Sequence, residues 1–193
     1  MLLLSTKLQQ LPIMSLQTGA KIAHITHSVV DPSTLDLVAY RVEDKKLDSE
    51  NWLLLTHDIR EVSDIGLIVD SVDELVREED IVKLKKILEL RFDLIEMSVV
   101  DDNGTKLGRI YDYSLDPLQF KIHQLYIKRP LIKSLQTSDL VVNRSQIVEI
   151  NNKNIVVNSA SLEEKAKPAA VANSFVNPFR KSSPSHGQST MKE

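Results

Sequence analysis

The chain of 193 residues contains no cysteine, which excludes disulfide scaffolds, thiolate zinc sites and cysteine nucleophiles and is typical of a reducing compartment. With only 5 glycines, it has little material for phosphate-cradling loops. No apolar run reaches the roughly 18 residues that a membrane-spanning helix needs. Apolar residues make up 42% and charged residues 26%, so the composition is that of a globular protein rather than a disordered or collagen-like one.

The start of the chain is apolar but too short for a secretory signal. Leu2 to Leu4 are followed by Lys7, whereas a signal peptide needs an apolar core of about 7 to 15 residues after a basic start. We expect Leu2–Leu4 to form part of a first strand in a cytoplasmic protein. The net charge is −6 over residues 1–78, +1 over 79–158 and +2 over 159–193. The acidic first part argues against nucleic-acid binding there, because neutralising phosphates requires clustered cations.

An internal repeat is visible at an offset of 85 residues. The segment GAKIAHITHSVVDPSTLDLVAYRV from Gly19 aligns with GTKLGRIYDYSLDPLQFKIHQLYI from Gly104, with five identities in 24 positions. Asp31-Pro32 falls on Asp116-Pro117, and apolar residues recur at matching positions. A looser echo aligns residues 56–59 with residues 137–140. Because the matches include turn residues as well as apolar spacing, we predict a duplicated structural unit.

Both copies have the pattern of short β-strands joined by tight turns. Short runs of β-branched and aromatic residues favour half-buried strands. Asn103-Gly104 predicts a hairpin turn in which Gly104 has a positive φ, and Gly19 takes its place in the first copy. The two Asp-Pro pairs predict turns, since proline presets φ and aspartate accepts hydrogen bonds from the turn backbone. Residues 151–154 predict a further hairpin.

Two segments depart from the β pattern. Ser71 and Glu74 form a capping box, which predicts one or two helical turns between the copies, with a strand over 87–94 as an alternative. Residues 159–193 hold 3 of the 7 prolines and few large apolar residues, so we expect a disordered tail. Within it, Phe175 and Phe179 flank an Asn-Pro step beside two cations. This arrangement suggests a short docking segment, with a plain tail as the alternative.

The second copy resembles the PRC-barrel family. The residues that carry the resemblance are an apolar strand and Gly-containing turn, a Leu-Gly-x-Ile strand with Gly108, an acidic turn and a later strand: residues 94–95, 99–110, 111–117 and 147–150. The first copy looks like a second such unit, with Ala23 in place of Gly108. Together the two copies cover about two-thirds of the chain.

The resemblance implies a mainly β protein with two tandem small PRC-type β-barrels joined by a short helical linker. The implied boundaries are a first unit at 1–70, the linker at 71–93, a second unit at 94–158 and the tail at 159–193. Members of this family include the C-terminal domain of the ribosome-maturation factor RimM and the cytoplasmic part of the photosynthetic reaction-centre H subunit. Both use the barrel as a docking surface and neither is an enzyme. Fold analogy alone does not decide function.

Motifs for catalysis or for cofactor or metal binding are weak. His24 and His27, with His57 and Asp58, are the candidate metal ligands, but residues three apart on a strand face opposite sides. The acidic pairs precede turns, and no nucleophile elbow or nucleotide-binding loop is present. We therefore expect no enzyme activity, no cofactor and no metal.

The basic residues of the second copy are the candidate partner contacts. They are Lys121, Lys128, Arg129, Lys133 and Arg144, with Tyr111, Tyr113 and Tyr126 as stacking groups. Strand alternation would place Tyr111 and Tyr113 on one face. The leading hypothesis is a non-catalytic adaptor that docks on a protein partner through Lys128, Arg129, Arg144, Phe175 and Phe179. The alternative is a ribosome-associated RNA-processing or maturation factor; the oligomeric state stays open.

Overall fold

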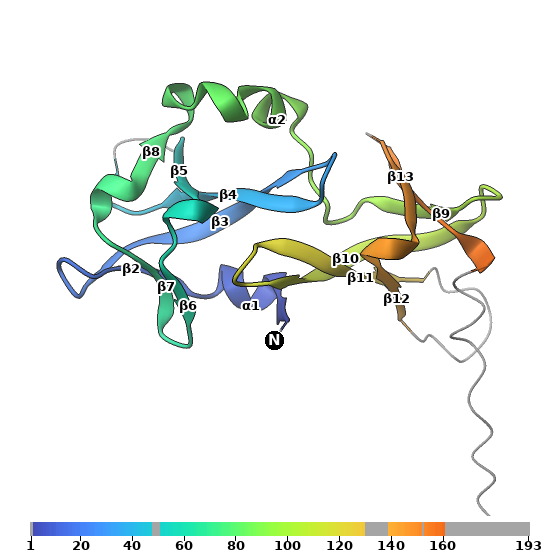
Figure 1. The fold of residues 1–193 in the computed structure, drawn as a ribbon, viewed down its shortest axis with the longest axis horizontal. Helices are drawn as coiled ribbons and strands as arrows, with labels where there is room; N and C mark the ends of the chain where they lie inside the picture. The colour runs from blue at the N-terminus through green and yellow to red at the C-terminus, as the bar shows by residue number, and fades with distance from the viewer. Residues whose placement is uncertain (1, 48–50, 130–138, 152, 161–193) are drawn as a thin grey trace, which may run out of the picture.

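The structure, a computed structural model, describes residues 2–47, 51–129, 139–151 and 153–160. The described chain is mainly β (Figure 1). Its strands are β1 (Leu3–Leu4), β2 (Pro12–Ser15), β3 (Lys21–Asp31), β4 (Asp36–Glu43), β5 (Trp52–Leu55), β6 (Glu61–Ser63), β7 (Gly66–Val69), β8 (Leu75–Arg77), β9 (Ser98–Asp101), β10 (Lys106–Asp116), β11 (Lys121–Lys128), β12 (Leu140–Asn143), β13 (Ile147–Ile150) and β14 (Asn154–Val157). Its helical segments are α1 (Ser5–Gln9), η1 (Thr56–Asp58), η2 (Val72–Glu74), η3 (Glu78–Asp80), η4 (Val82–Leu84), α2 (Lys85–Leu90) and η5 (Arg144–Gln146).

The two units repeat one pattern of strand pairing, as the internal repeat predicts. In the first unit β2–β3, β3–β4, β4–β5 and β6–β7 are antiparallel, and β7 runs parallel to β2. In the second unit β9–β10, β10–β11, β11–β12 and β13–β14 are antiparallel, and β14 runs parallel to β9. A 3-10 turn follows β5 and β12 alike. The duplication is therefore present in strand order, direction and turns.

The offset between the copies changes part-way along the repeat. Between β11 and β12 the chain is three residues longer than between β4 and β5, so the later elements match at an offset of 88. At this offset Ile59, Glu61 and Val69 coincide with identical residues, and η1 matches η5. The weaker echo between residues 56–59 and 137–140 is therefore wrong, because its offset of 81 requires a shorter loop in the second unit and the structure has a longer one.

The Asp-Pro turns are built alike in the two units. The Asp31 carboxylate accepts from the Ser33 N–H at 2.8 Å, and the Asp116 carboxylate accepts from the Leu118 N–H at 2.9 Å. Each bond closes the first half of the turn with a side-chain oxygen. Elsewhere φ is +65° at Gly19 and +81° at Gly104, where the sequence predicts a tight reversal and a positive value.

The ends of these two turns join the units. Leu35 and Phe120 occupy matching positions and have φ of 52° and 53°, a conformation that costs a non-glycine residue of order 1 kcal/mol. The Leu37 N–H donates to the Phe120 carbonyl at 2.8 Å, and the Ile122 N–H donates to the Leu35 carbonyl at 3.2 Å. The exchange is reciprocal because the two turns face each other. Both side chains are buried, so packing and these hydrogen bonds offset the strain.

The described strands do not close into the two separate barrels that the sequence suggested. Asp36 pairs with Lys121, and this link joins the units into one sheet with the order β13-β14-β9-β10-β11-β4-β3-β2-β7-β6. The second edge of β5 pairs with β8, so β5 does not close onto β6. Each unit is consequently an open, curved sheet within the described part of the chain.

The segments that lead into each unit pack on the other unit. Leu3 and Leu4 form β1, but this strand pairs with Leu115 and Ser114 of the second unit rather than with the first. Helix α1 follows and lies between β3 and β10, and α2 lies over β3 (Figure 1). The expected boundaries at 70 and 94 therefore separate the strands of the two units but not their packing.

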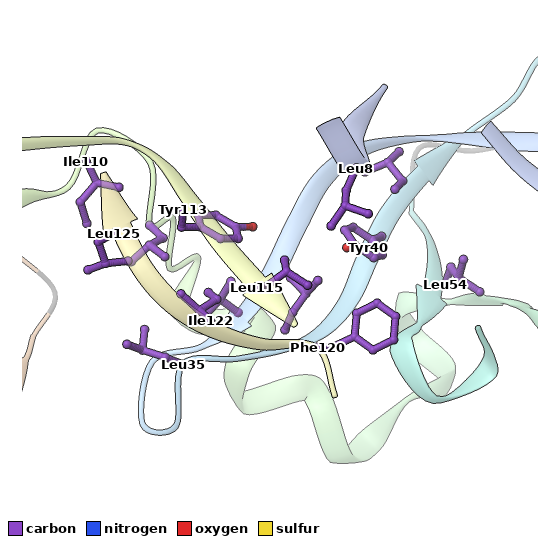
Figure 2. Close-up of a cluster of buried hydrophobic side chains, with 14 of the residues drawn as sticks. Leu8, Leu35, Tyr40, Leu54, Ile110, Tyr113, Leu115, Phe120, Ile122 and Leu125 are labelled. Atoms are coloured by element: carbon purple, nitrogen blue, oxygen red, sulfur yellow. The ribbon is translucent and has the colours of Figure 1, made fainter. Parts of the chain in front are cut away.

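A single core spans both units (Figure 2). Leu8 from α1, Tyr40 and Leu54 from the first unit face side chains of β10 and β11 from the second. The second-unit members labelled in Figure 2 are Ile110, Tyr113, Leu115, Phe120, Ile122 and Leu125. Because these side chains are buried against one another, the two units share the free energy of one hydrophobic core.

The linker forms the short helical turns that the capping box indicates. Ser71 precedes η2 and its hydroxyl accepts from the Asp73 N–H at 3.0 Å. The alternative of a strand over 87–94 is wrong, because residues 85–90 form α2. Leu88 is the buried residue of this helix, and it packs on the first unit.

Candidate interaction surface

The outer face of the first unit is covered by the linker. Val29, Ala39 and Leu53 form a small second apolar cluster with Leu88 of α2. Further apolar side chains pack around this cluster: Val38, Leu55, Val76, Ile81, Leu84 and Ile87. The apolar outer face of the first unit is thus covered by a helix of the same chain.

The matching face of the second unit has a polar row instead. Val29, Ala39 and Leu55 lie side by side in the first unit, and their counterparts in register are Ser114, Gln124 and Asn143. The Ser114 hydroxyl donates to Gln124 Oε1 at 3.4 Å, and Gln124 Nε2 donates to Asn143 Oδ1 at 3.2 Å. Leu4 of β1 pairs with Ser114 and α1 packs on β10, so Ser114 is buried, whereas Gln124 and Asn143 stay half-buried.

Two tyrosines lie beside this row. The rings of Tyr111 and Tyr126 are 6.3 Å apart between centroids, at an interplanar angle of 51°. The Tyr126 hydroxyl donates to Gln124 Oε1 at 3.1 Å, and the Tyr111 hydroxyl donates to Asp139 Oδ2 at 2.9 Å. Partial desolvation raises the pKa of Tyr111, and the hydrogen bond and the negative charge of Asp139 raise it further. Tyr111 is 39% exposed, so its ring offers apolar area to a partner while its hydroxyl is fixed.

The tyrosines border a recess of about 260 Å³. Its other walls are Leu2 and Leu4 from the N-terminal segment, with Asp112 and Ser114 below them. Asp112 is buried; the Ser5 and Thr6 hydroxyls donate to its carboxylate at 2.6 and 2.7 Å. An adjoining groove of about 620 Å³ is lined by Leu2, His123, Gln124, Asn143, Arg144 and Ser145. The surface is therefore hollowed and has hydrogen-bonding groups in its walls.

Tyr113 does not share the face of Tyr111, contrary to simple strand alternation. It is 2% exposed and belongs to the core, whereas Tyr111 reaches solvent. The strand register shifts between Ile110 and Asp112, and a β-bulge of this kind changes which side chains point outward. Burial raises the pKa of Tyr113 to about 12.

The predicted basic contacts divide into exposed and internally bonded residues. Lys128 and Arg129 are exposed at the end of β11. Arg144 Nη1 lies 3.3 Å from Asp36 Oδ1, and its guanidinium also donates to the Thr34 carbonyl, so it ties the second unit to the first. Lys121 is in register with Asp36. Lys133, Phe175 and Phe179 lie outside the described residues.

The histidines considered as metal ligands do not assemble a site in the described residues. His24 and His27 are both exposed on β3, and His57 Nε2 lies 3.6 Å from Asp58 Oδ1. Within the described ranges no group of three or more His, Asp or Glu side chains could hold a metal ion.

A second hollow of about 700 Å³ lies between the first unit, the linker and the start of the second unit. Its walls include the Arg41–Glu78 ion pair, which ties β4 to the linker, and the buried ring of Tyr113. Arg91 and Asp93 contribute one charge of each sign. With its opposite charges balanced, this hollow has no clear preference for one class of ligand.

A scan against models of protein families finds none that matches this chain, and a search of curated proteins finds no match. In the described part of the chain no helix has the length and apolar character needed to span a membrane.

Sequence reasoning identified the tyrosines and the two exposed cations but missed Gln124, Val141 and Asn143. Their signal is a contrast between the copies, because they replace the apolar residues Ala39, Leu53 and Leu55, of which Ala39 and Leu53 are buried. Val141, for example, is 38% exposed whereas its counterpart Leu53 is fully buried. The contrast is visible only with the offset of 88, which the strand pairings define.

Proposed function

We propose that the chain is a non-catalytic adaptor of two PRC-barrel-like units that docks a protein partner on the outer face of β10, β11 and β12. The observation that carries this proposal is the difference between the duplicated faces. One face is apolar and covered by α2, whereas its counterpart is polar and hollowed, with β1 and α1 against Ser114 and Asp112 and with Gln124 and Asn143 left half-buried. The shared strand order of the units supports their relation to small barrels, with closure left open.

The chemistry of the face supports a protein partner over RNA. Tyrosine rings and an adjoining amide row are typical of protein interfaces, where aromatic anchors combine with hydrogen bonds. The Asp139 carboxylate next to Tyr111 would repel a phosphate backbone. Arg144 is paired with Asp36, so the exposed cations of this region that the sequence analysis named are Lys121, Lys128 and Arg129. RNA contact predicts a larger contiguous basic face.

The double substitution Tyr111→Ala with Tyr126→Ala should reduce partner capture by at least tenfold. A truncated anchor tyrosine typically costs an interface about 2 kcal/mol or more. The measurement is a pull-down from the native cell with the tagged full chain, with and without nuclease. Leu118→Ala is the matched control, because Leu118 is 90% exposed on the β10–β11 turn away from the tyrosines.

Two outcomes would contradict the proposal. Capture that disappears on nuclease treatment would point to RNA as the ligand. Undiminished capture by the double variant, with a melting temperature near that of the control, would exclude this face as the docking surface.

We also propose that the tail supplies a second contact through Phe175 and Phe179. Ending the chain after Ala160 should leave the melting temperature within about 2 °C of the full chain, because the described core ends before that residue. Capture of the partner should fall, and Phe175→Ala with Phe179→Ala should reproduce the fall. A truncated chain that unfolds, or that captures as well as the full chain, would rule out this role for the tail.

A further inference from the structure

Among the described residues, no strand covers the outer edge of β12, whereas its counterpart in the first unit is covered. In the first unit β5 pairs with β4 on one side and with β8 on the other. In the second unit β12 pairs with β11, and no described residue pairs with its other edge. An unpaired edge presents backbone N–H and C=O groups that another strand can bond.

We infer that this edge binds an extended segment of a partner protein, antiparallel to β12, with two aliphatic residues followed by an acidic residue. The inference rests on the proposed function and specifies the partner. The first unit provides the intramolecular template: Leu75, Val76 and Arg77 of β8 pair with Leu54, Leu53 and Trp52. The matching positions of β12 are Val142, Val141 and Leu140, which are also aliphatic, so two aliphatic partner residues fit opposite them.

The charge of the third residue follows from a reversal between the units. Arg77 is in register with Trp52, which pairs with Val42, the residue before Glu43 and Asp44. At the matching positions the second unit has Lys128 and Arg129 after Ile127, which pairs with Leu140. Two acidic residues have become two exposed basic ones. Asp139 precedes Leu140 and accepts from the Tyr111 hydroxyl, so it offsets one of these two positive charges. A partner side chain in the place of Arg77 therefore meets net positive charge, which favours Asp or Glu.

The aromatic contact that holds Arg77 is also missing from the second unit. The Arg77 guanidinium carbon lies 4.8 Å from the ring centroid of Trp52, a cation–π contact. Leu140 occupies the position of Trp52 and offers no π face to a cation. The reversed charge and the missing aromatic ring both disfavour a basic partner residue opposite Leu140.

The chain's own sequence after β14 is a poor match for this edge. At the offset of 88, Glu163-Glu164-Lys165 falls where the first unit has Leu75-Val76-Arg77. Two acidic side chains would replace the aliphatic pair, and Lys165 would face Lys128 and Arg129. An occupant that fits the edge in this register accordingly comes from another molecule.

The test uses two capped peptides and the full chain. The first peptide has the sequence of residues 71–78, Ser-Val-Asp-Glu-Leu-Val-Arg-Glu, and the second carries Arg77→Glu. Titration followed by NMR should shift the backbone amides of residues 140–143. The Glu peptide should bind about tenfold more tightly than the Arg peptide, since it replaces repulsion from two exposed cations by attraction. A scrambled peptide with the composition of the Glu peptide should not shift these amides.

A charge swap on the protein gives the decisive arm. Lys128→Glu with Arg129→Glu should reverse the preference between the peptides. Lys85→Glu with Lys86→Glu on α2 is the control, because it changes the net charge equally at another exposed place and should leave the preference intact.

Several outcomes would overturn the inference. With peptide, they are amide shifts confined to β5 and a peptide preference that survives the Lys128 and Arg129 swap. Without peptide, they are amide shifts at 140–143 that depend on protein concentration, and amides of 140–143 that change when the tail is removed. The last two would assign the edge to a second copy or to the tail. If the peptides fail here while the Tyr111 and Tyr126 variant still loses its partner, the docking face stands and only its use of the β12 edge is wrong.

Discussion

Replacing Gly108 with alanine should lower the free energy of unfolding by about 3 kcal/mol. A Cβ atom at Gly108 would lie 2.2 Å from the Lys128 carbonyl oxygen and 2.8 Å from Ile127 Cγ2. The first of these atoms belongs to the backbone of the neighbouring strand and cannot turn aside. Gly108 also has φ of +152°, which L-residues rarely adopt. The added methyl group must therefore push β10 away from β11.

Gly104→Ala is the matched control for this prediction. Gly104 has φ of +81°, but no atom lies within 4 Å of the place where its Cβ would be. Only the backbone conformation is penalised, so we expect a loss of about 1 kcal/mol. Urea denaturation followed by circular dichroism gives both values. Equal losses for the two variants would mean that β10 and β11 separate easily, contrary to the close approach at Gly108.

The repeat and its turns could be predicted from sequence because they depend on local chemistry. Asp-Pro and Asn-Gly steps act within a few residues, and the alternation of apolar residues marks which side chains seek burial. From only five identities, these signals predicted that the two units share the same strand order and turns. Sequence alone placed Gly108 in a motif but did not show why a side chain cannot fit there. The reason is the close approach of Lys128, a residue of another strand.

Non-local pairing accounts for most of what the sequence did not predict. Leu3 and Leu4 are apolar and strand-forming wherever they pair, so their pattern does not reveal that they join β10 of the second unit. Barrel closure depends on which strand occupies the second edge of β5, and β8 reaches it from the linker. Periodicity identifies the buried face of a strand but not its neighbour.

The types of residue on the candidate surface could be predicted from the sequence, but their arrangement in space could not. Tyr111, Tyr126, Lys128 and Arg129 are the kinds of residue that contact partners, and sequence alone pointed to them. Arg144 belongs to the same kinds, yet its charge is paired with Asp36 of the other unit. Whether a face is free depends on which segments pack on it, and only the folded chain reveals that α2 lies on β3 while β1 and α1 lie against β10.

The shared core predicts that damage to one unit is felt in the other. Ile110→Ala should lower the free energy of unfolding by about 3 kcal/mol, because Ile110 is fully buried and the change removes three carbons from a packed core. Trp52 is the only tryptophan and lies in the first unit, on β5. Its fluorescence therefore reports on the unit that does not contain the substitution.

Denaturation of Ile110→Ala followed by Trp52 fluorescence should give the same lowered midpoint as circular dichroism. Ile110 and Leu54 lie toward opposite ends of the labelled cluster (Figure 2). Leu54 is two residues from Trp52 along β5, so no direct contact transmits the effect. The Leu35 and Phe120 turns and the Leu8 side chain between the units provide the coupling. The conservative Ile110→Val should shift both probes by about 1 kcal/mol. A fluorescence transition that stays at the wild-type midpoint while circular dichroism shifts would mean that the units unfold independently, and that the continuous core does not make them one cooperative structure.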